Sequence, residues 1–132
     1  MMNVVVLFQD RFVSKIRDGS KPHTIRGIRK GRQIQSGDTL SLRHWFSKPY
    51  RSKQVVIREV ECTCARDIQI ERNDREYGCG IVTIEGNTLD QIGCDLLAKS
   101  DGFEWFSEMV AWFERTHSLP FVGRLIEWSV KQ

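Results

Sequence analysis

The segment QVVIREVECTC at residues 54–64 is a long run in which apolar and polar residues alternate. This period of two is typical of a β-strand with one buried face. The apolar residues of DIQI at 67–70 indicate that the same strand continues. Immediately upstream, the Gly37-Asp38 turn leads into TLSLRHW at 39–45, which alternates in the same way. The sequence therefore predicts a sheet around a long central strand.

The flanking segments add both strands and helices. They are expected as a strand at 4–7, a helix at 9–18, an extended piece at 24–26, a strand at 80–86, helices at 89–98 and 104–115, and a closing strand at 122–130. Gly19 is placed to end the first helix, and Thr88 is placed to cap the second. The order β-α-β-β-β-β-α-α-β lacks parallel βαβ repetition, so we expect an α+β domain built on a small barrel or strongly bent sheet with helices at its ends.

An aromatic stripe marks the core side of the segment at 104–115. Phe103, Phe106, Val110 and Phe113 recur at helical spacing, which predicts packing against the sheet. Trp105, Met109 and Trp112 lie beside this stripe. A stripe of this kind favours core packing over a ligand site.

Composition limits the class of protein. The 132 residues, 40% apolar and 28% charged, predict one globular domain over 1–132. The chain has no apolar run of the ~20 residues that span a membrane. Its first residues lack a basic leader, so we expect a cytoplasmic protein with no membrane partner.

The four cysteines, Cys62, Cys64, Cys79 and Cys94, form no Cys-x-x-Cys pair. They predict reduced thiols, with a zinc site as the alternative. We therefore expect neither a metal nor a cofactor.

Charge is segregated along the chain. Residues 1–66 hold 14 Lys and Arg against 5 Asp and Glu, whereas residues 67–132 hold 6 against 12. The densest stretch, 11–58, holds 13 basic and 2 acidic residues. If this segregation persists in space, it creates a basic face that attracts a phosphate backbone. Alternatively, the two halves interleave and neutralise each other.

Lys21, Thr24 and Arg26 form a candidate reactive cluster. If residues 24–26 are extended, Thr24 and Arg26 point the same way and Ile25 faces the core. A hydroxyl beside an amine is a nucleophile-and-base pairing, provided that burial or a nearby charge such as Arg26 lowers the pKa of the amine. The alternative is that Lys21 and Arg26 are solvated and Thr24 is an ordinary strand residue.

Asp101, in the SDGF turn at 100–103, also has two interpretations. Its carboxylate either orients Lys21 and moves a proton, or it caps the helix that follows. Lys21, Thr24 and Asp101 are the predicted catalytic set. His23 is a possible proton-transfer assistant, and His117 belongs to no constellation in the sequence.

Basic and aromatic residues gather near the end of the strand at 39–45. Those predicted to bind substrate or RNA, together with Arg26, are Arg43, Trp45, Lys48, Tyr50, Arg51 and Lys53. An aromatic ring can stack on a base, and the cations can hold phosphates. Alternatively, Trp45 packs in the core and the loop at 46–53 is an ordinary polar surface loop.

GSKPHTIR at 19–26 resembles the Gly-x-Lys-x-x-Thr-x-Arg signature of the ASCH domain family. The segments GDTLSLRHW, KPYRSKQ, SDGF and LPFVGRLIEW agree with the same pattern, so the resemblance covers essentially the whole chain. It implies a small PUA-like mixed β-barrel with helices packed at its ends, associated with RNA or modified nucleosides.

One bacterial branch of that family consists of amidohydrolases that remove the acetyl group of N4-acetylcytidine. By position, its catalytic Lys, Thr and acidic residue fall on Lys21, Thr24 and Asp101, although the branch carries Glu where this chain has Asp. We therefore expect a protein that binds RNA or a modified nucleoside and hydrolyses an N-acyl group. The alternatives are a non-catalytic RNA-binding module and a metal-independent ribonuclease.

Overall fold

Strand β4 (Gln54–Arg72) is the central element of the fold and pairs with three other strands. Its first part pairs with β3 (Thr39–Trp45), its middle with β7 (Phe121–Val130) and its end with β5 (Gly80–Ile84), all antiparallel. Val60 has partners in both β3 and β7, so these two strands lie on opposite edges of β4. The computed structural model describes residues 1–130 and confirms the expected α+β class.

Three shorter strands complete the sheet. β1 (Asn3–Leu7) lies parallel to β3, β2 (His23–Gly27) lies antiparallel to β7, and β6 (Asn87–Thr88) pairs with β5. The strands β1-β3-β4-β7-β2 therefore follow one another, with the β5-β6 hairpin on the far end of β4.

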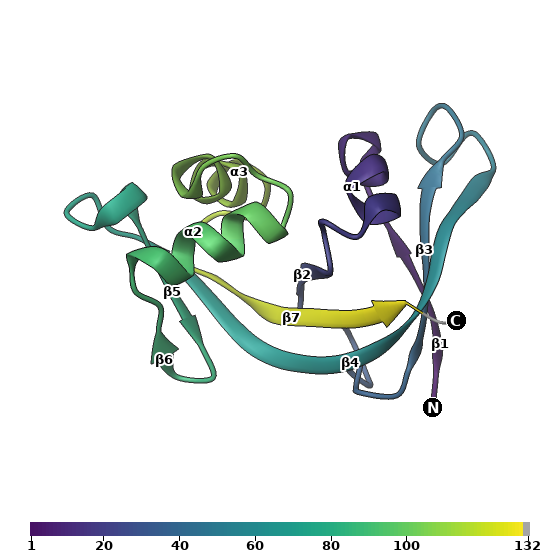
Figure 1. Ribbon diagram of the computed structural model, residues 1–132, viewed down its shortest axis with the longest axis horizontal. Helices are drawn as coiled ribbons and strands as arrows, with labels where there is room; N and C mark the ends of the chain where they lie inside the picture. The colour runs from purple at the N-terminus through teal and green to yellow at the C-terminus, as the bar shows by residue number, and fades with distance from the viewer. Residues whose placement is uncertain (131–132) are drawn as a thin grey trace.

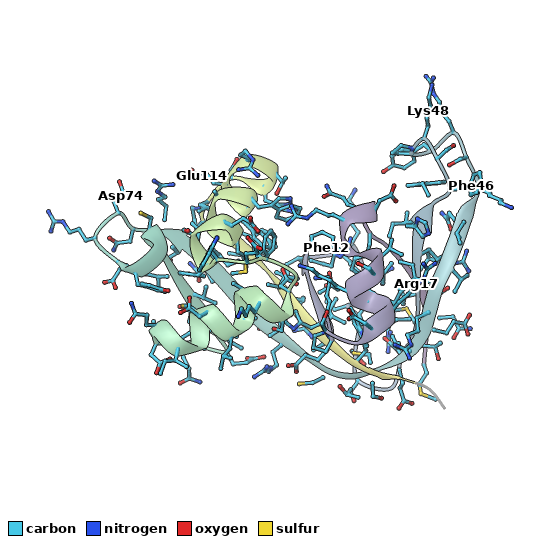
Figure 2. All side chains as sticks on the ribbon, turned by 45° about the horizontal axis from the view of Figure 1, so that its top comes forward. Phe12, Arg17, Phe46, Lys48, Asp74 and Glu114 are labelled. Atoms are coloured by element: carbon cyan, nitrogen blue, oxygen red, sulfur yellow. The ribbon has the colours of Figure 1, made fainter. Side chains whose placement is uncertain are left out.

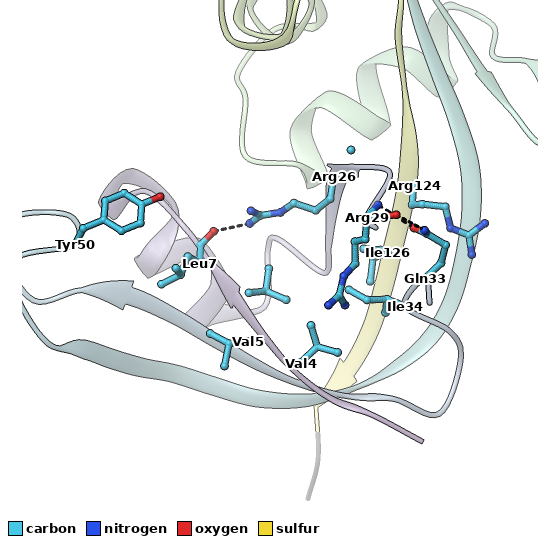
Figure 3. Close-up of a pocket in the computed structure, with 12 residues that line it drawn as sticks. Val4, Val5, Leu7, Arg26, Arg29, Gln33, Ile34, Tyr50, Arg124 and Ile126 are labelled. Atoms are coloured by element: carbon cyan, nitrogen blue, oxygen red, sulfur yellow. Dashed lines mark hydrogen bonds between the residues drawn. The ribbon is translucent and has the colours of Figure 1, made fainter. Parts of the chain in front are cut away.

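The sheet does not close into the expected barrel. Within residues 1–130, no backbone ladder joins β1 to β2. A side chain spans this seam instead, because Nη2 of Arg26 on β2 donates to the carbonyl oxygen of Leu7 on β1 at 2.6 Å (Figure 3). The alternating pattern of the sequence predicts the individual strands. Closure of the barrel depends instead on whether the edges of β1 and β2 pair, and these strands are separate segments of the chain.

The helices lie toward the two ends of β4 (Figure 1). A 3-10 turn η1 (Asp10–Phe12) and helix α1 (Val13–Asp18) lie near β3, and Gly19 ends α1 with a φ of 84°, as predicted. Helices α2 (Gln91–Ser100) and α3 (Phe106–His117) lie near β5, with the short 3-10 turn η2 (Tyr77–Cys79) beside them. No helix in residues 1–130 has the length and apolar character to cross a membrane.

The aromatic stripe packs in the core as predicted. Phe103, Phe106, Val110 and Phe113 are all buried. Trp105, in contrast, is 68% exposed, because it precedes α3 instead of lying on its inner face. Burying aromatic rings of this size contributes much of the stabilisation of a small domain.

The predicted start of the second helix is wrong. Asp90, not Thr88, is the N-cap of α2, and its carboxylate accepts a hydrogen bond from the backbone N–H of Gly93 at 2.8 Å. Thr88 instead pairs with Thr83 in the β5-β6 hairpin. The two-residue strand β6 is too short to leave a periodic signal in the sequence.

The charge segregation of the sequence persists in space. Residues 71–117, which hold 4 basic and 10 acidic residues, form the end with α2 and α3, and the basic stretch 11–58 forms the opposite end. Figure 2 shows Asp74 and Lys48 at these opposite ends. The pair Arg124–Asp67, at 2.8 Å, lies between them on β7 and β4. The two halves also meet through the ion pairs Lys21–Asp101, at 2.6 Å, and Arg11–Glu108, at 3.6 Å, so their charges are segregated only in part.

Replacing Gly123 by Ala tests how closely β2 and β7 approach. A Cβ at Gly123 would clash with the carbonyl oxygen of Arg26 and lie 2.6 Å from the Phe121 ring. We expect Gly123→Ala to lower the free energy of unfolding by about 1–3 kcal/mol, measured by urea denaturation. Its register partner Gly27 has nothing within 4 Å of an added Cβ, so Gly27→Ala is the matched control. Equal effects of the two substitutions would contradict the proposed clash.

Candidate functional site

A buried ion pair joins Lys21 to Asp101. The Lys21 Nζ donates to Oδ1 of Asp101 at 2.6 Å and to the Asp101 backbone carbonyl at 2.7 Å. The side chains are only 3% and 6% exposed. Lys21 lies between α1 and β2, whereas Asp101 follows α2, so the contact links positions 80 apart in the chain.

Local turns bring both partners to this point. Gly19 reverses the chain after α1, and the Lys21 N–H then donates to the carbonyl oxygen of Lys15 at 3.0 Å. On the other side, Gly102 takes a φ of 101°, and a Cβ there would lie 2.8 Å from the Phe12 ring. Glycine at 102 therefore allows the Asp101 turn to approach α1 closely.

Opposing effects act on the charge of Lys21. Its Nζ lies 4.8 Å from the centroid of the Phe12 ring and 5.9 Å from that of Phe8, and both ring faces stabilise an ammonium. Burial lowers the pKa of the Lys21 amine below its ordinary value, and repulsion from Arg26 acts in the same direction, although Asp101 opposes the shift. An amine that is easily deprotonated can serve as a general base.

Thr24 and Arg26 lie on one face of β2, as predicted from their spacing. The Arg26 Nε donates to Oγ1 of Thr24 at 3.0 Å, and the Arg26 guanidinium lies 4.7 Å from the Phe8 ring centroid. Ile25 between them is buried in the core. Arg26 is thus held on three sides, by Thr24, by Phe8 and by the Leu7 carbonyl.

These side chains line a common pocket of about 180 Å³, which we call the Lys21 pocket. Its polar walls come from Lys21, Thr24, Arg26 and Asp101. Its other walls are Leu7, Phe8, Gln9, Ile25, Gly27, Phe103, Trp112, Phe113 and His117. The structure therefore brings together the three residues predicted to be catalytic, while their catalytic role stays a prediction.

Asp101 does not cap the helix that follows it. It is the C-cap residue of α2, and Trp105 stands at the N-cap of α3. The Asp101 carboxylate faces Lys21 instead. Capping and ion pairing use the same residue type, so the sequence alone leaves both interpretations open.

Two histidines near Asp101 and Arg26 received little weight from the sequence. His23 is buried, and its Nε2 lies 3.3 Å from Oδ1 of Asp101 but lacks the geometry of a hydrogen bond within the described chain. His117, at the end of α3, lines the Lys21 pocket, and burial lowers the pKa of its imidazole. His117 reaches the Lys21 pocket because the end of α3 lies near β2 in the fold. No local sequence motif predicts this position.

Two of the residues predicted to bind RNA lie beside the Lys21 pocket. Trp45 and Tyr50 pack together with ring centroids 5.2 Å apart, and both line a pocket of about 380 Å³ that includes Leu7, Phe8 and Gln9. We call this the Tyr50 pocket. It shares those three residues with the Lys21 pocket.

Apart from Arg26, which lines the Lys21 pocket, the other predicted RNA-binding residues do not line these two pockets. Lys48, Arg51 and Lys53 lie in the loop between β3 and β4, whose tip is the far end of the molecule in Figure 2. Arg43 is held by Oγ of Ser41 at 2.9 Å and by Oε1 of Gln54 at 3.1 Å. Arg43 thus has its polar partners within the sheet and does not line the Lys21 pocket.

Metal ligands do not gather at this site. Among residues 1–130, no three His, Cys, Asp or Glu side chains lie together in a way that could hold a metal ion. All four cysteines are free thiols, and a register shift separates Cys62 from Cys64 on β4. The chain matches no family model, no curated protein and no solved structure.

A double-mutant cycle tests the energetic coupling of Lys21 and Asp101. We expect Asp101→Ala to lower the free energy of unfolding by about 3–5 kcal/mol, because it leaves a buried ammonium without its counter-charge. Adding Lys21→Met removes that orphaned charge, so the double variant should lose less than the two single variants combined, measured by urea denaturation.

Asp74→Ala is the control for this cycle, because it breaks an exposed pair with Arg72. It should leave the unfolding midpoint nearly unchanged. Strict additivity of the Lys21 and Asp101 variants would show that the pair is not coupled.

Proposed function

We propose that this protein is an ASCH-like amidohydrolase with a PUA-like fold, which removes an acyl group from the exocyclic amine of a cytidine-type base. The observation that carries the proposal is the convergence of Lys21, Thr24 and Asp101 in one pocket beside Arg26. The bent, incompletely closed sheet and the GSKPHTIR segment at 19–26 support the family assignment.

The size and walls of the Lys21 pocket support a small planar substrate. Its volume of about 180 Å³ lies below the range of roughly 300–1,000 Å³ that is typical of pockets for drug-sized ligands. Phe8, Phe103 and Trp112 line it, and aromatic walls suit a flat base. We infer that an acylated base enters, while the sugar stays outside.

The first chemical step uses Lys21 as general base. The neutral amine accepts the proton of the Thr24 hydroxyl, or of a water molecule held by it, as the oxygen forms a bond to the acyl carbon. The carbonyl π electrons move to its oxygen, where the Arg26 guanidinium stabilises the developing negative charge. Asp101 holds the Lys21 amine in position and stabilises the ammonium that forms.

The second step releases the nucleoside. The tetrahedral intermediate collapses, the C–N bond breaks, and the Lys21 ammonium returns its proton to the departing amine. If Thr24 is the nucleophile, water then attacks the acyl ester and Lys21 accepts the proton of that water. The ester C–O bond breaks, and the Lys21 ammonium returns the proton to the Thr24 oxygen. The products are a carboxylic acid and the unmodified base, and the reaction needs no oxidant or cofactor.

The second candidate function is RNA binding without catalysis. It is favoured by the exposed loop that carries Lys48, Tyr50 and Arg51 at the basic end of the molecule. An RNA-binding module predicts steep salt dependence of affinity and no product. That alternative leaves the convergence of Lys21, Thr24 and Asp101 in one pocket without a chemical role, so we rank hydrolysis first.

Acetate release from N4-acetylcytidine tests the proposed reaction. Lys21→Met should lower kcat/KM by about 10²–10⁴-fold, because it removes the general base. Thr24→Val should have a comparable effect, whereas Thr24→Ser should retain activity. Lys99→Met, which removes an exposed lysine on α2, is the control. Absence of turnover by the wild-type protein on any acylated cytidine would refute the proposal.

The pH dependence tests the role of the amine. The pKa of Lys21 is lowered by burial, so kcat/KM should rise with pH as the amine deprotonates, with a midpoint below the ordinary value of about 10.4. Lys21→Arg should be inactive throughout, because a guanidinium keeps its proton at every accessible pH. A kcat/KM that does not fall at low pH anywhere in the range over which the protein stays folded would exclude Lys21 as the base.

A further inference from the structure

A third pocket lies in the seam between β1 and β2, and we call it the seam pocket (Figure 3). Its volume is about 380 Å³, twice that of the Lys21 pocket. Val4, Ile34 and Ile126 contribute apolar walls, and Arg29 and Tyr50 contribute polar ones. It exists because a single side chain, not a backbone ladder, bridges β1 and β2.

Arg29 places in this pocket a positive charge that has no ion-pair partner among the described residues. Figure 3 shows its guanidinium pointing into the pocket. No side chain within residues 1–130 forms a hydrogen bond or ion pair with that guanidinium. Its backbone is fixed, however, because the Gln33 side chain donates to the Arg29 carbonyl at 2.7 Å and accepts from the Arg29 N–H at 3.2 Å. The charge is thus presented from an ordered loop and has no counter-ion.

The chemistry of the walls indicates an anionic ligand with an apolar part. The described residues that line the seam pocket include no Asp or Glu. Of the three arginines that line it, Arg124 is paired with Asp67 at 2.8 Å and Arg26 donates to Thr24 and to the Leu7 carbonyl, which leaves Arg29 as the one whose guanidinium has no polar partner among the described residues. An inorganic anion would bind to the Arg29 guanidinium and leave the apolar walls uncovered. A nucleotide would bind Arg29 through its phosphate and would also place its base and sugar against Val4, Ile34 and Ile126.

The seam pocket adjoins the Lys21 pocket. Leu7, Arg26 and Gly27 line both of them, so the two pockets lie on either side of the Arg26 bridge. The Lys21 pocket is too small for more than the reacting base and its acyl group, so the sugar and phosphates of a larger substrate lie outside it, and the seam pocket is one of the two described pockets that adjoin it.

We propose that the seam pocket binds the nucleotide next to the reacting one, with the intervening phosphate at Arg29. The substrate is then a nucleotide within an RNA strand, not a free nucleoside. This inference rests on the proposed function for the identity of the reacting base. It adds a binding site and a substrate class.

RNA binding tests the seam pocket without requiring turnover. The probe is fluorescein-labelled hexacytidylate RNA, followed by fluorescence anisotropy at several salt concentrations. Arg29→Ala should weaken binding by about 10-fold, the effect of losing one charged hydrogen-bonding contact. The slope of log affinity against log salt should also decrease in magnitude by about 0.7, the value for one phosphate contact to a single strand.

Arg75→Ala is the matched control for this binding experiment. Arg75 is an exposed arginine in the turn between β4 and η2, at the acidic end of the molecule. We expect its removal to leave both the affinity and the salt slope unchanged. Equal losses in Arg29→Ala and Arg75→Ala would show that only net charge matters, and would overturn the proposal.

Kinetics then separate this inference from the proposed function. The substrates are N4-acetylcytidine and a dinucleotide in which it follows a cytidine 3′-phosphate. The wild-type protein should prefer the dinucleotide in kcat/KM by about 10-fold, and Arg29→Ala should lose that preference while it keeps its activity on the nucleoside.

Equal rates on both substrates, unaffected by Arg29→Ala, would overturn the seam-pocket proposal and leave the hydrolase intact. Turnover of neither substrate would refute the hydrolase. In that case, an RNA affinity that Arg29→Ala leaves unchanged would overturn the seam-pocket proposal as well.

Discussion

The buried contact between Lys21 and Asp101 is the interaction on which the site depends. It joins the loop before β2 to the turn after α2, and so it fixes the helical end of the molecule against the strand that carries Thr24 and Arg26. A buried ion pair costs desolvation energy and is weak evidence for stability by itself. Here the same burial brings the lysine toward its neutral form, which is the state that a general base requires.

The Arg26 side chain spans the seam at which the sheet does not close. A complete ladder between β1 and β2 would satisfy the strand edges and fill the space on either side. A single guanidinium bonds to the Leu7 carbonyl and to Thr24 instead, with the Lys21 pocket on one side of it and the seam pocket on the other. The open seam accounts for the seam pocket, whereas residues from Asp101 to His117 provide much of the wall of the Lys21 pocket.

The sequence predicts those features that depend on local periodicity or on a short motif. Alternation over 54–70 predicts β4, helical spacing predicts the buried face of α3, and spacing within β2 predicts that Thr24 and Arg26 share one face. The remaining features depend on contacts between distant segments. The unclosed seam requires two strand edges to meet, and the seam pocket requires Val4 and Ile126 to lie together, which no local pattern encodes.

The most direct test of the account is the titration of Lys21 itself, followed through the ¹³Cε chemical shift of labelled lysine by NMR. Lys21→Met assigns the resonance, and the exposed lysines of the same protein serve as internal references. The account predicts a midpoint below the ordinary lysine value of about 10.4. A midpoint at or above that value would mean that Asp101 outweighs burial. Lys21 would then remain an ammonium ion, and the pocket would lack its base.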